Sequence, residues 1–357
     1  MLIFLSILTI LGQFLVFHGC GTHNFAYMFT GRLIFGYGSE SLTAAQNVYI
    51  THYFHNEKLA FPISIGNAVA LFGTYLNYSL TAEIARKYGL KFGFLSGMFF
   101  CMISLLAIIL TITIDFFIEK SLKNPQEIAT SSDEVEILIK PEILLNSEEK
   151  SVFSRFSASF WILLFSSVIV YASSIGFSSI AVSYFVESYF PKVDLKTAEI
   201  ESTRIMSLDS LTNIFSSIFL AIFMHYTSSN FLYIFPTINS IISLIAFTML
   251  LLTIFPFLTL ILDGLASSLN YNILNTMIPR MVKEKDLGLA YCMAAAGNNL
   301  GTSLIPIIAA FLRNARDNYD MAIGLFILLN VGSLISAMMF YFQYKEKLLK
   351  EKEEANY

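Results

Sequence analysis

The feature that most constrains this chain is a series of apolar runs, each about twenty residues long, with short polar interruptions between them. A helix needs roughly 20 mostly apolar residues to cross a bilayer, because no water in the hydrocarbon core can satisfy its backbone. Ten segments of the 357-residue chain meet this requirement. They lie near residues 2–20, 25–52, 60–85, 90–118, 158–185, 203–225, 230–247, 249–277, 288–312 and 320–344. The sequence therefore predicts an all-α, polytopic membrane protein with about ten transmembrane helices.

Composition points to the same class. Charged residues make up 13% of the chain, about half of the roughly 25% that a soluble domain carries. The net charge of −4 gives no indication of a nucleic-acid partner. The five histidines and three cysteines are scattered, and no phosphate loop, nucleophile elbow, zinc spacing or disulfide framework is present in the sequence. We therefore expect no enzyme activity, no metal and no cofactor.

Polar segments divide the chain. The longest covers residues 119–157 and separates four spans from six, so we predict a first lobe in 1–118, a central loop in 119–157, a six-helix lobe in 158–344 and a tail in 345–357. Ten spans place both termini on one side. If that side and the central loop are cytosolic, they carry thirteen Lys and Arg residues against eight opposite, in agreement with the positive-inside rule.

Polar side chains within the spans are the best candidates for a site, because an ionisable group in hydrocarbon is unfavourable by several kcal/mol unless it faces the bundle interior or water. The second span has the clearest pattern. One of its helical faces carries Arg32, Gly36, Glu40, Thr43 and Asn47, with Gln46 beside it. Arg32 and Glu40 are about 12 Å apart along the axis, too far for a direct ion pair. This face predicts a polar cavity; the alternative is a pair of structural charges satisfied by neighbouring helices.

Other spans carry similar faces. In 60–85, Gly66, Ala70, Gly73 and Asn77 form one stripe, for which helix packing is the favoured interpretation, with Asn77 as the exception. In the second half the polar or small-residue faces comprise Asp209, Asn213 and Ser216; Asp263, Ser267, Asn270, Tyr271 and Asn275; and Ala294, Gly297, Asn298 and Gly301. Asp263 could equally lie at a headgroup layer. Polar faces in both halves favour a central solute pathway, and the predicted substrate-binding residues are Glu40, Gln46, Asn47, Asn77, Asp263 and Asn299.

Two sequence blocks carry a resemblance to a known family. The pattern Arg32-x-x-x-Gly36-x-Gly38 resembles the fourth-helix motif of the major facilitator superfamily, in which these residues would have a structural or gating role. The stretch GRLIFGYGSESLTAAQN (31–47) is similar to the corresponding stretch of the lysosomal dipeptide transporters called major facilitator superfamily domain-containing protein 1, and DLGLAYCMAAAGNNLG (286–301) is a second similar block.

The resemblance implies a two-lobe bundle of twelve helices around a central cavity, and the four-plus-six count fits if the first two helices are absent. It also implies a lysosomal uniporter that exports dipeptides, with Glu40 facing the substrate, and a glycosylated lysosomal accessory membrane protein as a partner. The chain departs from the family where its arginine is replaced by Leu71 and its Trp-Pro by Asn275-Thr276.

Three hypotheses follow. The first is a dipeptide carrier that works by rocking of two lobes about a midplane site. The second is a carrier for another small nutrient, such as an amino acid, sugar or organic anion, which the replacement at Leu71 motivates. The third is a transport-inactive membrane scaffold that binds a partner protein, motivated by the expected absence of two helices.

Overall fold

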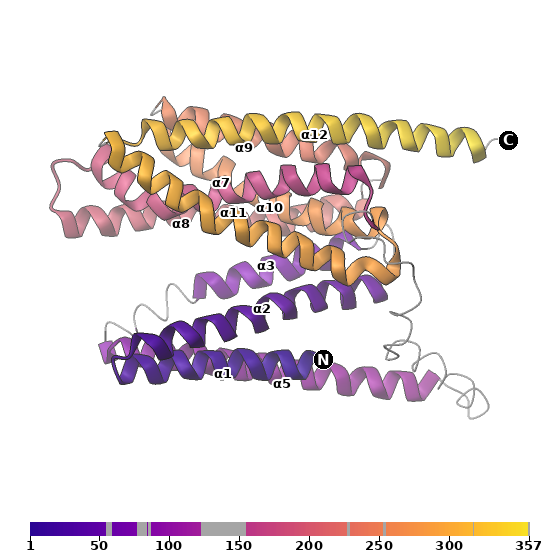
Figure 1. The fold of residues 1–357 in the computed structure, drawn as a ribbon, viewed down its shortest axis with the longest axis horizontal. Coiled ribbons are helices and arrows are strands. Elements are labelled where there is room, and N and C mark those ends of the chain that lie inside the picture. Colours follow the sequence, from indigo (N-terminus) through magenta and orange to yellow (C-terminus); the bar gives the residue numbers. More distant parts are fainter. Residues whose placement is uncertain are drawn as a thin grey trace. The chain divides into compact units, whose positions relative to one another are not determined.

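The computed structural model of the chain describes residues 1–54, 59–76, 84, 87–122, 155–226, 229–252, 255–316 and 318–355. Within these ranges the chain forms ten α-helices, two short 3-10 helices and no strand (Figure 1). The α-helices are α1 (Leu2–Gly21), α2 (Phe25–Tyr53), α3 (Ala60–Leu76), α5 (Leu90–Leu122), α7 (Ala158–Tyr189), α8 (Leu195–Tyr226), α9 (Phe235–Leu251), α10 (Pro256–Met281), α11 (Leu287–Arg316) and α12 (Asp320–Ala355). The predicted all-α class is confirmed, and each predicted span corresponds to one of these helices.

Seven of the described helices are long and apolar enough to cross a membrane, and α3 is a shorter apolar helix. Many of their large apolar side chains are exposed. In α5, for example, Phe99, Leu106 and Phe116 are each more than half exposed. A soluble protein does not expose apolar surface on this scale, so these faces are expected to contact lipid.

The boundary between α9 and α10 differs from the prediction. The sequence placed it near residue 248, whereas α9 continues to Leu251 and α10 begins at Pro256. The apolar run is continuous through this region, so hydropathy alone marks no boundary. Proline is tolerated in the first helical turn because its missing N–H would be unpaired there anyway, and Phe255 before it has a left-handed backbone with φ of 47°.

The described residues belong to two compact units. Unit 1 comprises Met1–Thr43 and Asn77–Phe156, and unit 2 comprises Ala44–Leu76 and Ser157–Tyr357. The end of α2 and all of α3 are therefore grouped with the six C-terminal helices. The predicted lobe boundaries at 118 and 158 stay a prediction.

In unit 1, α1 packs closely against α2 and α5. A Cβ added at Gly31 of α2 would lie 2.7 Å from the carbonyl oxygen of Gly12, and one added at Gly38 would lie 2.9 Å from the Thr9 methyl. Toward α5, the Gln13 amide of α1 donates to the backbone carbonyl of Phe94 at 3.1 Å. Small residues thus allow the backbones to approach, as is usual for helices in lipid.

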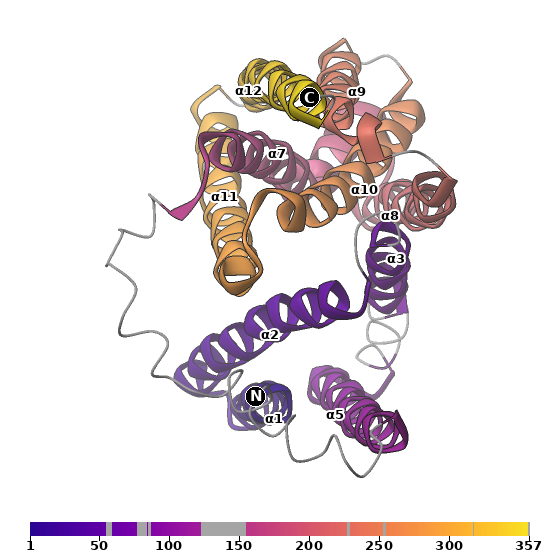
Figure 2. The ribbon, with the colours of Figure 1, turned by 90° about the vertical axis from the view of Figure 1, so that its right-hand side faces the viewer.

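In unit 2, α10 is the central helix (Figure 2). It packs against α3, α7, α8, α9 and α11. A cluster of aromatic rings fills the space between α7, α9 and α12, with Phe177, Phe247 and Phe326 almost completely buried. Helices α7 and α8, which pack against α10, each begin with a side-chain cap. Ser157 accepts from the Phe160 N–H at 3.3 Å before α7, and Asp194 accepts from the Thr197 N–H at 3.0 Å before α8.

Candidate functional site

The densest polar region of the described chain is the buried surface of α10. The buried polar residues of this helix are Thr259, Asp263, Ser268, Asn270, Asn272, Asn275 and Thr276. A buried polar group is destabilising unless it is hydrogen-bonded. The partners of these side chains lie on several helices of unit 2, so α10 organises a polar network through the unit.

A cluster of hydrogen bonds joins the end of α2 to α10 and α11. The Asn47 amide donates to Asn275 Oδ1 at 3.0 Å, and the Tyr291 hydroxyl donates to the Asn275 carbonyl at 3.0 Å. Thr51 lies beside them: its single hydroxyl hydrogen can be donated to the Asn47 carbonyl, 2.7 Å away, or to the Tyr291 hydroxyl, 3.2 Å away. Asn47, a predicted binding residue, is therefore buried against α10 with 6% of its surface exposed.

A second chain of hydrogen bonds joins α3, α8 and α10. The Asn67 amide donates to the Ser217 hydroxyl at 2.7 Å, and Ser217 lies 2.8 Å from the Ser268 hydroxyl. The amide of Asn272 donates to the Ser268 carbonyl at 2.9 Å. Asn67 and Asn272 are not among the predicted site residues. The available signal for this face of α3 was a second polar residue, the buried Ser64, three positions before Asn67.

The third polar group contains two carboxylates. Asp263 is 2% exposed, and its Oδ2 accepts a hydrogen bond from Ser174 of α7 at 2.8 Å; Ser174 also lies 3.0 Å from the Ser267 hydroxyl. Asp209 lies on α8 where this helix crosses α10 beside Asp263: a Cβ added at Gly264 would lie 2.5 Å from the Asp209 carbonyl oxygen, and the Asp209 residue is half-buried. Asp263 is thus enclosed by protein in this structure.

The remaining predicted residues lie elsewhere. Glu40 of α2, in unit 1, is exposed, as are Gln46 of α2 and Asn299 of α11, both in unit 2. Gln46 lies beside α3, with its Nε2 3.8 Å from the position of a Cβ added at Gly66. Asn77 lies outside the described residues. The substrate-binding roles of all six residues stay predictions.

The motif residues of α2 have distinct environments. The Arg32 guanidinium lies 5.9 Å from the ring centroids of both Phe35 and Phe94, a cation–π geometry that holds the charge against aromatic faces. Gly38 is a close-packing residue against α1, whereas a Cβ at Gly36 would meet no atom within 4 Å. Among the described residues, Gly36 therefore makes no close contact with another helix.

The small-residue stripe predicted for α3 is not its packed face. A Cβ at Gly73 would meet nothing within 4 Å, and Ala70 is exposed. The buried residues of α3 are Ala60, Ile63, Ser64, Asn67 and Ala68. Within unit 2 the packed face of α3 is a different one, because helical spacing identifies a face but not its direction, and the packing role of the stripe stays a prediction. In α11 the same kind of stripe does pack, since a Cβ at Gly301 would lie 2.7 Å from that of Ala172 in α7.

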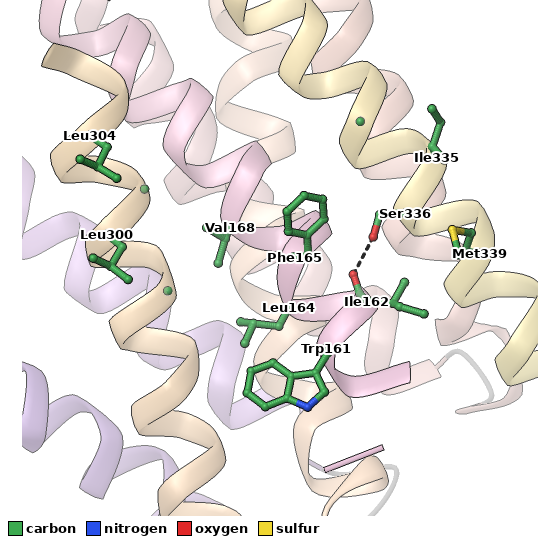
Figure 3. A pocket seen from close by; sticks show the side chains of 13 residues that line it. Trp161, Ile162, Leu164, Phe165, Val168, Leu300, Leu304, Ile335, Ser336 and Met339 are labelled. Carbon is green, nitrogen blue, oxygen red and sulfur yellow. Dashed lines mark hydrogen bonds between the residues drawn. The ribbon is translucent and has the colours of Figure 1, made fainter. Parts of the chain in front are cut away.

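An open groove of about 690 Å³ lies between α7, α11 and α12 (Figure 3). Its walls are apolar, with Trp161, Phe165 and Leu304 among the lining side chains. The hydroxyl of Ser336 in the lining donates to the Ile162 carbonyl at 2.8 Å. A polar solute would find few hydrogen-bond partners on these walls, so we do not assign this groove as its site.

Three comparisons with known proteins bear on this arrangement. The family described as Major Facilitator Superfamily matches residues 1–262. The chain is 25% identical over 351 residues to the chicken (Gallus gallus) protein named lysosomal dipeptide transporter MFSD1, covering 94% of this chain and 73% of that one. The human (Homo sapiens) protein of the same name is 24% identical over 353 residues, covering 95% and 70%.

Solved structures share the fold. The fucose:proton symporter FucP of E. coli aligns with a TM-score of 0.68 at 14% identity, over 95% of this chain and 83% of that one. The proton:xylose symporter XylE aligns with a TM-score of 0.64 at 13% identity, over 95% and 79%. At these identities the likeness concerns the fold alone.

Proposed function

Because the chain belongs to the major facilitator superfamily, we propose that this multi-pass membrane protein carries dipeptides out of the lysosome by alternating access. The observation that carries the proposal is the similarity, over 94% or more of the chain, to proteins named lysosomal dipeptide transporters. Rocking of two bundles about a site at the membrane midplane is the movement that such folds use.

Glu40 is the residue to which we assign the cationic end of the substrate. Its carboxylate is exposed, and Ser39, Ser41 and Thr43 make the neighbouring turns of α2 polar, so it is available to a ligand. A dipeptide presents an ammonium group, and a charge-assisted hydrogen bond from that group to a carboxylate is about twice as strong as a neutral one. Gln46, Asn47, Asn77, Asp263 and Asn299 would supply the polar contacts. Asn47 would reach the substrate only if its bond to Asn275 opens, and Asp263, which is 2% exposed, only if the helices around it move apart.

The test is uptake of a radiolabelled dipeptide by proteoliposomes that contain the purified protein or its Glu40→Gln variant. The variant keeps the shape of the side chain and removes its charge. We expect the affinity for a dipeptide to fall about tenfold or more, since a hydrogen bond to a charged group contributes roughly 1.5–3 kcal/mol. Glu199→Gln, an exposed glutamate on α8, is the matched control and should transport normally. Equal uptake by both variants would remove Glu40 from the site.

One observation favours a second candidate, a carrier for another small nutrient. The chain has Leu71 where the resembling family has an arginine, so a carboxylate-binding group of the substrate site would be missing. Competition by a panel of amino acids, sugars and organic anions in the same assay separates the two candidates. Absence of uptake for every solute, with intact folded protein, would instead support the transport-inactive scaffold.

A further inference from the structure

Asp209 and Asp263 form a carboxylate pair in unit 2. The proposed function does not define whether this pair is protonated. The two side chains come from α8 and α10, which cross tightly beside them. A Cβ added at Gly264, the residue after Asp263, would lie 2.5 Å from the carbonyl oxygen of Asp209 and 3.2 Å from the backbone nitrogen of Asn213. The pair is thus fixed at a helix crossing and not on a movable loop.

The polar groups around the pair include more hydrogen-bond acceptors than donors. Oδ1 of Asp263 and Oδ1 of Asp209 are both buried without a hydrogen-bond partner, and so is Oδ1 of Asn213, one turn further along α8. Ser174 supplies a single donor, to the other oxygen of Asp263. An ionised carboxylate can only accept, whereas a protonated one donates through its O–H. One added proton would therefore supply the donor that these buried oxygens lack.

The charges around the pair also favour a bound proton, because no nearby cation of the described chain compensates the two carboxylates. Among the described residues, neither aspartate forms an ion pair. The nearest cation along α8, Arg204, is exposed and bonded to Glu201 at 2.7 Å. The cation of α10, Arg280, lies seventeen residues from Asp263, about 25 Å along the axis.

The other elements packed on the pair add no cation beside it. Helices α3 and α9 carry no charged residue in their sequences, and Tyr75 is the sole titratable residue of α3. Helix α7 presents Ser174 to the pair and carries Tyr171 one turn earlier. Its one charged residue, Glu187, is bonded to Arg313 of α11 at 2.7 Å. Further titratable groups on the surrounding helices are Tyr271, two turns after Asp263, Tyr291 of α11 and the buried Tyr184 of α7, none of which is a cation.

Two adjacent negative charges without a cation are strongly unfavourable in a medium of low dielectric constant, and such pairs retain a proton. We propose that Asp209 and Asp263 together bind one proton in the folded protein, and that gain and loss of this proton control the rate of transport. The step is simple protonation: one carboxylate takes up H⁺ from water and becomes a carboxylic acid that donates to its neighbours. The transport part of this inference rests on the proposed function, whereas the protonation itself does not.

The first experiment measures the proton directly. Infrared spectroscopy of the reconstituted protein near neutral pH should show the carbonyl stretch of a buried, protonated carboxyl, shifted by exchange into D₂O. Asp209→Asn and Asp263→Asn should each remove this band, while Glu199→Gln, which removes an exposed carboxylate of α8, should keep it. A wild-type spectrum without the band, or a band that survives both aspartate substitutions, would overturn the proposal.

The second experiment measures the consequence. Initial rates of dipeptide uptake, with equal pH on both sides of the vesicle, should vary with pH between about 5 and about 8 in the wild type and much less in either aspartate variant. Replacement of sodium by choline should change nothing, because the site takes a proton; a sodium requirement removed by Asp263→Asn would overturn the assignment. Wild-type pH profiles in both aspartate variants would disprove control by the pair. If no dipeptide is transported at all, the proposed function fails while the infrared result still decides the protonation.

Discussion

In unit 1, helix α1 approaches its neighbours through glycines, whereas in unit 2 helix α10 is joined to its neighbours through amides and hydroxyls. Gly12, Gly31 and Gly38 bring backbones into contact in unit 1, and the Gln13 amide there bonds to a neighbouring helix. Around α10, side chains such as Asn275 and Ser268 bond to partners on several helices. Lipid is as apolar as a leucine side chain, so helices in a membrane associate through close packing or through polar contacts. The two units of this chain rely on these contributions in different proportions.

This comparison predicts that unit 1 is sensitive to added volume and unit 2 to lost polar atoms. The largest effect is expected for Gly31→Val in unit 1. The new side chain would collide with the backbone of α1, where the Gly12 oxygen is 2.7 Å from the Cβ position, and backbone cannot yield as a flexible side chain can. Overpacking of this kind destabilises by about 3 kcal/mol. Thermal unfolding in detergent measures it.

The control for that prediction is Gly36→Ala in the same helix. Its Cβ would meet no atom within 4 Å, and alanine favours a helix over glycine. We expect an unchanged or slightly higher midpoint of unfolding. Equal destabilisation by the two substitutions would show that close approach does not distinguish these positions.

The next effect is expected for Asn275→Leu in unit 2. The substitution removes the acceptor of the Asn47 amide and leaves that buried group unpaired. We expect a loss of about 1–2 kcal/mol, toward the upper end of values for such bonds in membranes because a buried donor loses its partner. The double variant Asn47→Leu with Asn275→Leu should lose less than the sum of the single changes. Strict additivity would mean that the Asn47 and Asn275 side chains do not stabilise the fold through their shared hydrogen bond.

The smallest effect is expected for Glu187→Gln, outside both kinds of contact. Glu187 accepts from Arg313 at 2.7 Å and from the Tyr319 hydroxyl at 3.0 Å, but the side chains of the ion pair are 45% and 32% exposed. Solvent screening limits such a pair to about 0.5 kcal/mol, and added salt should abolish the difference from the wild type. A loss as large as that of Asn275→Leu would place this cluster among the main stabilising contacts.

The number and order of the helices could be predicted from the sequence because each apolar run is long and the membrane requirement is strict. Boundaries inside a continuous apolar run could not, as the break at Phe255 and Pro256 shows, since hydropathy does not change there. The left-handed backbone of Phe255 and the proline after it mark the start of α10 there.

The candidate site was predictable in part. Helical spacing placed Asn47 on a polar face, and the structure gives this amide a buried partner on α10. The spacing could not identify the partner, which lies 228 positions away in the sequence, nor the orientation of α3, whose buried amide is Asn67 and not a member of the predicted stripe. Which polar residues meet depends on how helices rotate against each other, and that information lies in tertiary packing.

Helix α12 has a mechanical consequence. Its 36 residues extend about 54 Å, well beyond the roughly 30 Å of a bilayer core, and its last turns are rich in Lys and Glu. Helix α12 therefore continues beyond the membrane as an extension of the last span, along the same helix axis. A spectroscopic label near Ala355 would therefore report changes in the tilt of that span. For a given change in tilt, the displacement of the label increases with the length of the helix beyond the membrane.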